Sequence, residues 1–406
     1  MTTIYAARWL LPDSAAAIEN GAVAVEGSRI AGVGPEAEIV ATFPTARIES
    51  LGEAVILPGL KNIHTHLELT ALRGYLEKEE NDFFAWLRKL TIARLERMTP
   101  DDIRVSATWG ACEAVRAGIT YVADASDSGL LSMLALQEVG LRGVVFQESF
   151  GPDPRLVQEN VEQLKIKLGE LRARESELVR AGVSPHAPYT VCAAQLELIA
   201  ELAQTEDLML MMHAAESEAE KLLLREGRGV FAEGLARRSI EWKTPGMSTI
   251  QYLKQVGILE TQPQLAHCIT VDDDDIETLR ETHCTVAHCP KSNAKLGHGR
   301  APLAKFIDAR IPVGLGSDSV ASNNTCDILE EARFATLLSR ASGGHISAEQ
   351  ILAAATFGGE LRKGAEADLI AVSLTGVHQT PAHDPVATLI FASSGRDVIL
   401  TVIAGR

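Results

Sequence analysis

The sequence predicts an α/β fold: a (β/α)8 TIM barrel with a small β-sandwich domain built from both chain ends. Eight short apolar runs alternate with helical patterns between residues 58 and 360, and eight such units over roughly 250 to 300 residues are typical of this barrel. The rival is a doubly wound open sheet, in which the first strand is expected to lead into a glycine-rich phosphate turn. GLKNIHTH, which follows the first run, is not such a turn.

The two chain ends have a β pattern. We assign residues 1–57 and 361–406 to the small β domain, and residues 58–360 to the barrel. GAVAVEGSRIAGVG alternates small apolar residues around a Glu-Gly-Ser-Arg turn, as a β-hairpin does. ADLIAVSL and DVILTVIAGR repeat this pattern near the C-terminus. The two ends can therefore pair in one domain, with the barrel as an insert between them.

The elements of the barrel follow from the same alternation. The expected strands lie in AVILPGLKNIH, ITYVADAS, GVVFQESFG, VRAGVSPHAP, LMLMMHAAE, PQLAHCIT, TVAHCPKSN and IPVGLGSDS. The expected helices include DDIRVSATWGACEAVRAG, AAQLELIAELAQ, DDDDIETLRE and CDILEEARFATLLSRAS. We expect the acidic run Asp272–Asp275 to open a helix, because carboxylates are favourable at the positive N-terminus of a helix.

Composition narrows the possible partners and the location. The chain has 406 residues, of which 38 are Lys or Arg and 54 are Asp or Glu, so its formal charge is -16. This negative charge disfavours nucleic acid or an anionic membrane as a partner. No uncharged apolar run is long enough for a membrane span, and the N-terminus has no basic leader pattern, so we expect a cytoplasmic protein. The six cysteines form no CxxC pair, which predicts reduced, buried thiols.

Polar residues stand at the C-terminal ends of the predicted strands. They are His64 and His66 on the first strand, His186 on the fourth, His213 and Glu216 at the fifth, His267 on the sixth, His288 on the seventh and Asp318 at the eighth. Active sites of such barrels lie on this face. Residues far apart in the sequence are therefore expected to meet there.

Part of this set predicts a metal site. His64 and His66 lie on the same side of one strand, about 6 to 7 Å apart along the backbone, near enough to bind one cation. With His213 and Asp318 they offer three imidazoles and a carboxylate, which suit one divalent metal, Zn²⁺ first and Fe²⁺ as the alternative. A second metal would need a bridging ligand, often a modified lysine, and the fourth strand has no lysine.

Two further strand-end residues are candidates for proton transfer. Glu216 lies three residues after His213, where a carboxylate can act as general acid or base without binding the metal; the alternative is an exposed residue in the run ESEAE. His267 is either a core histidine or catalytic.

The loop histidines are expected to be exposed, because they lie in Gly- or Pro-rich segments. They are His298, His345, His378 and His383. No Gly-x-Ser-x-Gly motif appears, which argues against covalent hydrolysis.

Several motifs together resemble a known family. They are PGLKNIHTH, SPHAPYT, HAAE, AHC, HCPKSN and GLGSDS, in this order. The chain is similar over nearly its whole length to the amidohydrolase superfamily, in its branch of aminohydrolases acting on nucleosides and bases. The resemblance implies that His64, His66, His213 and Asp318 hold one divalent metal. It also implies that Glu216 and His267 shuttle protons and polarise the attacking water, while Asp318 accepts a proton from it.

Within that branch, HTHLELT, FFAWLRKL and EWKTPGMSTIQYL look most like the aminodeoxyfutalosine deaminases of an alternative menaquinone pathway. This resemblance implies release of ammonia from a purine nucleoside carrying a benzoate. Arg73 is the expected partner of the benzoate, and Glu68, Glu148, Ser149 and His186 are the other expected substrate-binding residues.

Other functions remain open at this stage. The alternatives are deaminases of adenosine, S-adenosylhomocysteine or guanine, and a triazine-type hydrolase that displaces chloride or an alkylamine. A non-catalytic scaffold is disfavoured, because all the expected metal ligands are present.

The chain differs from the family pattern in one segment: it is about ten residues shorter between Thr356 and Gly364. The expected partner is a small-molecule nucleoside, and a homodimer is possible.

Overall fold

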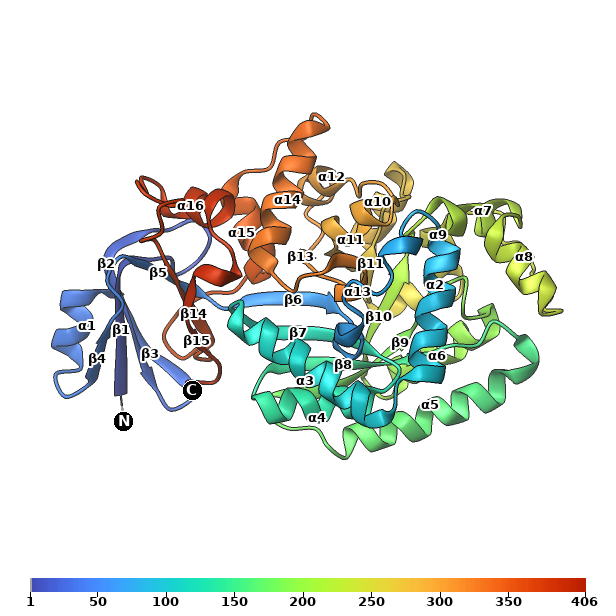
Figure 1. Ribbon diagram of the computed structural model, residues 1–406, viewed down its shortest axis with the longest axis horizontal. Coiled ribbons are helices and arrows are strands. Elements are labelled where there is room, and N and C mark those ends of the chain that lie inside the picture. The colour runs from blue at the N-terminus through green and yellow to red at the C-terminus, as the bar shows by residue number, and fades with distance from the viewer. Residues whose placement is uncertain (1) are drawn as a thin grey trace.

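Eight parallel strands form the centre of the protein (Figure 1), whose computed structural model describes residues 2–406. The strands are β6 (Leu60–Thr65), β7 (Ile119–Ser126), β8 (Arg142–Ser149), β9 (Val179–Pro185), β10 (Met209–Ala214), β11 (Gln264–His267), β12 (Thr285–His288) and β13 (Val313–Leu315). Each pairs with its neighbours in chain order. A bridge between Thr65 and Asp318 joins the last strand to the first. The prediction of a (β/α)8 barrel is confirmed.

Apolar side chains fill the inside of the barrel. The cluster consists of Ile63, Ala123, Ala125, Val144, Phe146, Met211, Ala266 and Ala287. Because this core is packed, a ligand cannot pass through the barrel, and the polar residues that follow each strand open onto one face.

Helices surround the barrel (Figure 1). They are α3 (Pro100–Arg116), α4 (Gly129–Val139), α5 (Val157–Arg172), α6 (Ala193–Thr205), α7 (Glu218–Glu226), α8 (Val230–Arg237), α9 (Thr249–Gln255), α10 (Asp273–Glu281), α11 (Pro290–Lys295), α12 (Leu303–Asp308), α13 (Val320–Asn323), α14 (Ile328–Ala341) and α15 (Ala348–Thr356). Asp272 caps α10 and Asp275 completes the capping box, which satisfies backbone N–H groups that the helix leaves free. The acidic run therefore opens a helix, as predicted.

An additional helix lies between the first two barrel strands. The 3-10 segment Leu67–Leu72 follows β6 directly, a short 3-10 turn covers Glu77–Glu79, and α2 (Phe83–Ile92) comes next. Asp82 caps α2 by accepting a hydrogen bond from the Ala85 N–H. The helix continues into a π-helical turn, Ala93–Arg97. Such turns widen a helix and are frequent at functional sites.

The small sheet stands at the other end of the molecule from α8 (Figure 1). Its strands are β1 (Thr2–Leu10), β2 (Ile18–Glu26), β3 (Arg29–Pro35), β4 (Arg47–Ser50), β5 (Ala54–Pro58), β14 (Leu369–Ser373) and β15 (Val398–Val402). β2 and β3 form the predicted hairpin, which turns at Gly27 with φ of 58°. β14 pairs antiparallel with β5, so the two chain ends meet.

One continuous hydrogen-bonded sheet supplies both layers of this small domain. The sheet curls so that Val23 and Val25 of β2 share a core with Leu369 and Ala371 of β14. The helix α1 (Glu36–Thr42) packs on the opposite face through Ile39.

Part of the C-terminal segment belongs with the barrel helices. Residues 357–368 lead from α15 to β14 without a further helix. After β14 the chain forms α16 (Pro385–Ala392), which packs against α14 and α15. Among the described residues, no helix is long and apolar enough to cross a membrane.

All six cysteines are free thiols. Five are buried, as predicted, but Cys112 is exposed. The expectation for Cys112 was wrong because its side chain lies on the outer face of α3, where Val105 and Trp109 are also exposed.

Candidate active site

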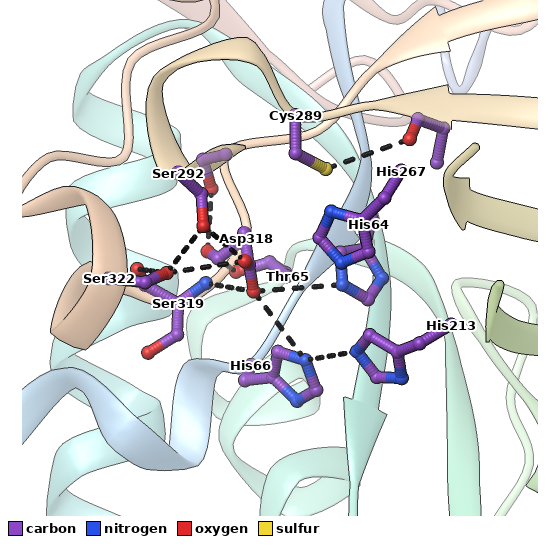
Figure 2. A network of polar contacts seen from close by, with 12 residues as sticks. His64, Thr65, His66, His213, His267, Cys289, Ser292, Asp318, Ser319 and Ser322 are labelled. Atoms are coloured by element: carbon purple, nitrogen blue, oxygen red, sulfur yellow. Dashed lines mark hydrogen bonds and ion pairs between the residues drawn. The ribbon is translucent and has the colours of Figure 1, made fainter. Parts of the chain in front are cut away.

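The histidines at the ends of β6 and β10 meet Asp318 at the mouth of the barrel (Figure 2). The Nε2 atoms of His66 and His213 are 3.2 Å apart. Oδ1 of Asp318 lies 3.6 Å from Nε2 of His64 and 3.6 Å from Nε2 of His66. The convergence expected from strand-end positions is therefore present in the structure.

This geometry fits one divalent metal. Metal–nitrogen bonds of about 2.0 to 2.1 Å in a tetrahedral site place neighbouring ligand atoms about 3.3 Å apart, and the separations here are 3.2 to 3.6 Å. Nε2 of His64 is also buried without a hydrogen-bond partner. A buried polar atom normally has a partner, and a cation at this point would provide one.

The three imidazoles are in the protonation state that metal binding needs. Burial lowers the pKa values of His64, His66 and His213 to about 4, so the rings are neutral at pH 7. Nδ1 of His213 lies 2.8 Å from the carbonyl oxygen of His186. The neutral ring donates from Nδ1 to this carbonyl, which leaves a lone pair on Nε2 directed at the cluster.

Hydrogen bonds fix the Asp318 carboxylate. Its Oδ2 accepts from the hydroxyls of Ser292, at 2.6 Å, and Ser322, at 3.2 Å, and its Oδ1 accepts from the N–H of Ser319 at 2.6 Å (Figure 2). Burial alone would raise the pKa of Asp318. The contact with His64 and the nearby rings of His267 and His66 outweigh burial and hold this pKa well below its ordinary value. The group is therefore an oriented carboxylate. Sequence reasoning missed both serines, although Ser292 lies in the motif HCPKSN.

Glu216 is buried beside this cluster, so it is not part of a solvated run. Its Oε2 accepts from the hydroxyl of Tyr189 at 3.0 Å, and its Oε1 lies 3.6 Å from Nε2 of His267. Burial raises the pKa of Glu216, but the neighbouring imidazoles of His267, His298 and His213 outweigh it and lower the pKa below the ordinary value. The free site therefore holds an ionised carboxylate.

His298 corrects the expectation that it is exposed. Only 6% of its side chain is accessible, and its Nε2 lies 3.7 Å from Oε1 of Glu216. The flanking Gly297 and Gly299 have φ values of 69° and 104°, a region that glycine enters without steric cost. These glycines let the loop after α11 turn the imidazole inward. A histidine between two glycines, just after a strand-end motif, is the sequence feature that could have identified it.

A cavity of about 520 Å³ opens onto these residues. Side chains of α2, Phe83, Trp86, Leu87 and Leu90, form much of one apolar wall. Phe150 and Tyr189 contribute from other segments. The cavity therefore combines a polar floor at the strand ends with largely apolar walls.

Two of the predicted substrate-binding residues, Glu148 and His186, line this cavity. Glu148 is buried, and its Oε1 has no hydrogen-bond partner. Burial and the charge of Glu68 raise the pKa of Glu148 well above its ordinary value. His186 lines the cavity next to it, and burial lowers the pKa of His186 well below its ordinary value.

Glu68 lines the cavity but has little capacity left for a ligand. Its Oε1 accepts from Arg94 at 3.2 Å and from the N–H of Asp127 at 3.3 Å. Its Oε2 accepts from the hydroxyl of Ser126 at 2.7 Å and the N–H of Ser128 at 3.0 Å. Glu68 therefore anchors Arg94 and the loop after β7.

Ser149 and Arg73 were also expected to bind the substrate, but neither lines this cavity. The hydroxyl of Ser149 accepts a hydrogen bond from Nε2 of Gln195, a residue of α6, at 3.0 Å. Arg73 pairs with Glu113 and donates to the carbonyl of Asn324 at 2.9 Å. Its loop directs it outward, where it links three segments on the outside of the barrel.

Two other arginines line the cavity, and sequence reasoning missed both. Arg94, on the π-helical turn, is paired with Glu68 at 3.2 Å and with Asp127 at 2.9 Å. Arg238, just after α8, is exposed and forms no ion pair within the part of the chain that the structure describes. The charge of Arg94 is thus balanced by direct ion pairs. The pKa of Asp153 is lowered by its pair with Arg155, at 2.6 Å, and only at longer range by Arg238.

The whole barrel and part of the small domain match a known family. Residues 55–406 match the model of the Amidohydrolase family, and residues 21–46 match an imidazolonepropionase-like composite domain of bacteria. The chain belongs to the amidohydrolase family. This membership confirms the predicted superfamily and the prediction of a hydrolytic enzyme.

The protein relatives point to deaminases. One is 5-methylthioadenosine/S-adenosylhomocysteine deaminase of Pelotomaculum thermopropionicum, 32% identical over 404 residues, covering 95% of this chain and 88% of the relative. Another, of the same name, is from Symbiobacterium thermophilum, 31% identical over 405 residues, covering 96% and 88%.

Solved structures share the fold. An adenosine deaminase from Xanthomonas campestris with bound zinc superposes with a TM-score of 0.85 at 25% identity, covering 100% of this chain and 92% of the other. A guanine deaminase from C. acetobutylicum has a TM-score of 0.83 at 18% identity, covering 100% and 99%. At this lower identity the second likeness supports the fold alone.

Proposed function

We propose that this amidohydrolase is a metal-dependent hydrolytic deaminase of an adenine nucleoside, which it converts with water to the oxo product and ammonia. One observation carries the proposal: the ionised, buried Glu216 lies beside the His64, His66, His213 and Asp318 cluster at the floor of an apolar-walled cavity. Such a site holds a flat, largely apolar ring against a cation and a proton-transfer group. The deaminase names of the relatives support the same reaction.

We assign the metal site to four residues. His64, His66, His213 and Asp318 would hold one divalent cation, Zn²⁺ first and Fe²⁺ as the alternative. When bound, such a cation supplies Lewis acidity and makes water a better nucleophile near neutral pH.

The protein residues handle the protons. Glu216 is ionised in the free site, so it accepts one proton of the attacking water and passes it to the ring nitrogen next to the carbon under attack. Asp318 accepts the second proton, which moves to the amino group as that group leaves as ammonia. Nδ1 of His267 lies 2.8 Å from Oδ1 of Asn293, so the lone pair on Nε2 of His267 is free to polarise the water.

For the substrate we propose aminodeoxyfutalosine, an adenine nucleoside that carries a benzoate. The apolar walls around Phe83, Leu87 and Phe150 suit its aromatic part. A desolvated carboxylate without a partner costs several kcal/mol, and arginine offers a bidentate match. Arg238 is the better partner than Arg94, because Glu68 and Asp127 already neutralise Arg94.

The names of the relatives favour a second candidate. 5-Methylthioadenosine and S-adenosylhomocysteine are also adenine nucleosides with extended 5′ groups, and both appear in the relatives' names. The first has no anionic group, so a dependence on Arg238 separates it from the benzoate substrate.

The test is ammonia release by the metal-loaded protein on a panel of amines. The panel contains aminodeoxyfutalosine, 5-methylthioadenosine, S-adenosylhomocysteine, adenosine and guanine, with a chlorotriazine assayed for chloride. We expect kcat/KM for aminodeoxyfutalosine to exceed that for adenosine by at least about tenfold, equivalent to roughly 1.4 kcal/mol of transition-state binding. A preference for the thioadenosines would reject the finer assignment. Chloride release without deamination of any nucleoside would reject the function.

A further inference from the structure

Oε1 of Glu216 lies between two imidazoles. Nε2 of His267 is 3.6 Å away and Nε2 of His298 is 3.7 Å away. Both nitrogen atoms are buried without a hydrogen-bond partner. A buried polar atom normally finds a partner, and Oε1 of Glu216 is a strong acceptor within reach of both. The question is which ring donates to it.

His267 cannot donate while its ring is neutral. Its Nδ1 lies 2.8 Å from Oδ1 of Asn293, an oxygen that only accepts, so the ring proton resides on Nδ1. A neutral imidazole has one N–H, which leaves Nε2 of His267 as a bare acceptor facing another acceptor. With the ring proton on Nδ1 of His267, Nε2 of His298 is the other imidazole nitrogen near Oε1 of Glu216, at 3.7 Å.

We propose that His298 is a positioning residue, which donates from Nε2 to Oε1 of Glu216 and holds this carboxylate toward the substrate. The inference rests on the proposed function, since it assigns Glu216 the proton transfer. His298 has no other hydrogen-bond partner at Nε2 among the described residues. Catalytic contacts are often long in a free site and tighten when the substrate is bound, so we expect the distance of 3.7 Å to shorten in the substrate complex.

The surroundings hold both groups in place. Phe83 meets the His298 ring edge to face, with 4.4 Å between ring centroids. Tyr189 donates to Oε2 of Glu216 at 3.0 Å. With donors on both oxygens, the plane of the carboxylate is fixed. Phe83 also lies on the α2 wall of the cavity, so the residue that packs on His298 faces the substrate space.

Two variants of similar size separate donation from packing. His298→Leu fills the space without a donor, and His298→Gln offers an amide N–H near the position of Nε2. We expect His298→Leu to lower kcat by about 10- to 100-fold, the usual cost of a misplaced reacting group, with KM within threefold. His298→Gln should recover most of this loss. Melting temperature and metal content, measured on both, should match the parent. A kcat for His298→Leu within twofold of the parent, or no recovery by Gln, would overturn the proposal.

A titration tests the contact without any substrate. In the metal-loaded full chain with ¹³C-labelled histidine rings, the His298 resonance is identified by its absence in His298→Gln. Glu216, His267 and Asp318 face this ring; burial lowers its pKa, and the carboxylate of Glu216 raises it. Glu216→Gln should therefore lower the pKa of His298. Glu218→Gln, an exposed change on α7, should not.

These readouts keep the two proposals apart. An unchanged His298 pKa in Glu216→Gln overturns the inference, whatever the enzyme deaminates. Absence of ammonia from every nucleoside rejects the proposed function, and the titration still decides whether His298 senses Glu216.

Discussion

The floor and the α2 wall of the cavity are built in different ways. Floor residues come from the ends of hydrogen-bonded strands: the N–H of Asp318 donates to the carbonyl of His64 at 2.9 Å, so backbone pairing itself brings their side chains together. The wall comes from α2 and the π-helical turn, Phe83–Arg97, which are inserted between β6 and β7. Strand register fixes the floor, whereas packing alone places the wall.

Two arginines between β6 and β7, Arg73 and Arg94, illustrate the consequence of this difference. Arg73 follows β6 closely in the sequence, yet it points outward to Glu113. Arg94 is 21 residues further on, and the π-helical turn carries it into the cavity. Proximity in sequence to a strand end locates floor residues but not wall residues. The following experiments test this contrast.

The largest expected effect is loss of the metal from the floor. The double change His64→Ala and His66→Ala removes two of four donors whose atoms lie 3.2 to 3.6 Å apart in the native cluster. Elemental analysis should give about one metal per parent chain and close to none in the variant, with deamination lost. His345→Ala, in an exposed loop, is the control. Unchanged metal content in the double variant would show that this cluster is not the metal site.

The next effect concerns proton transfer at the floor. Glu216→Gln keeps the size of the side chain but cannot accept a proton, so kcat should fall by a factor on the order of 10² to 10⁴. Steady-state kinetics on the best nucleoside, together with metal content, measures this. Glu218→Gln on the exposed side of α7 should keep the parent rate. A rate for Glu216→Gln within threefold of the parent would leave Glu216 without a catalytic role.

A smaller effect is expected at the mouth of the cavity. Arg238→Met removes an unpaired charge and should raise KM for a carboxylate-bearing nucleoside about tenfold, which is roughly 1.4 kcal/mol, with adenosine unaffected. Arg73→Met, outside the cavity, is the matched control and should change neither. Equal KM changes for both substrates would mean that Arg238 does not recognise the anionic group.

The smallest expected effect is a pH dependence of folding stability at Asp124, where β7 meets the segment that follows β6. Asp124 accepts from the N–H of Leu67 at 2.7 Å, and its second oxygen is buried without a partner. Burial raises the pKa of Asp124 to about 8. Because the folded pKa exceeds the unfolded one, the folded state holds this proton more tightly. Its contribution to stability is complete below about pH 4 and is lost as pH rises toward 8.

Asp124→Asn should remove this pH dependence while its amide oxygen still accepts from Leu67. Between pH 5 and 7 the unfolding free energy of the parent should fall, relative to the variant, by up to about 1.4 kcal/mol per pH unit. Denaturant unfolding of both proteins across this range measures the difference. Parallel pH profiles would show that Asp124 is ionised in the folded protein.

The sequence predicted the barrel, the hairpin of the small sheet and the floor of the cavity. Each of these follows from a periodic pattern: strand and helix alternate, and His64, His66, His213, His267 and Asp318 stand where strands end. In a closed parallel barrel all such ends meet on one face. The order of the chain was therefore enough to bring these residues together, although their separation in sequence exceeds 250 positions between His64 and Asp318.

Only the tertiary structure decided which other groups reach the cavity. Arg73 lies outside the cavity and His298 lies beside Glu216, although both follow a strand-end motif. The positive φ angles of Gly297 and Gly299 set the direction of the His298 loop. Glu68 lies in the cavity as predicted, but the four donors that occupy its oxygens come from segments that sequence order does not place beside it. Side-chain direction in loops depends on long-range packing and hydrogen bonding, which have no periodic pattern in the sequence.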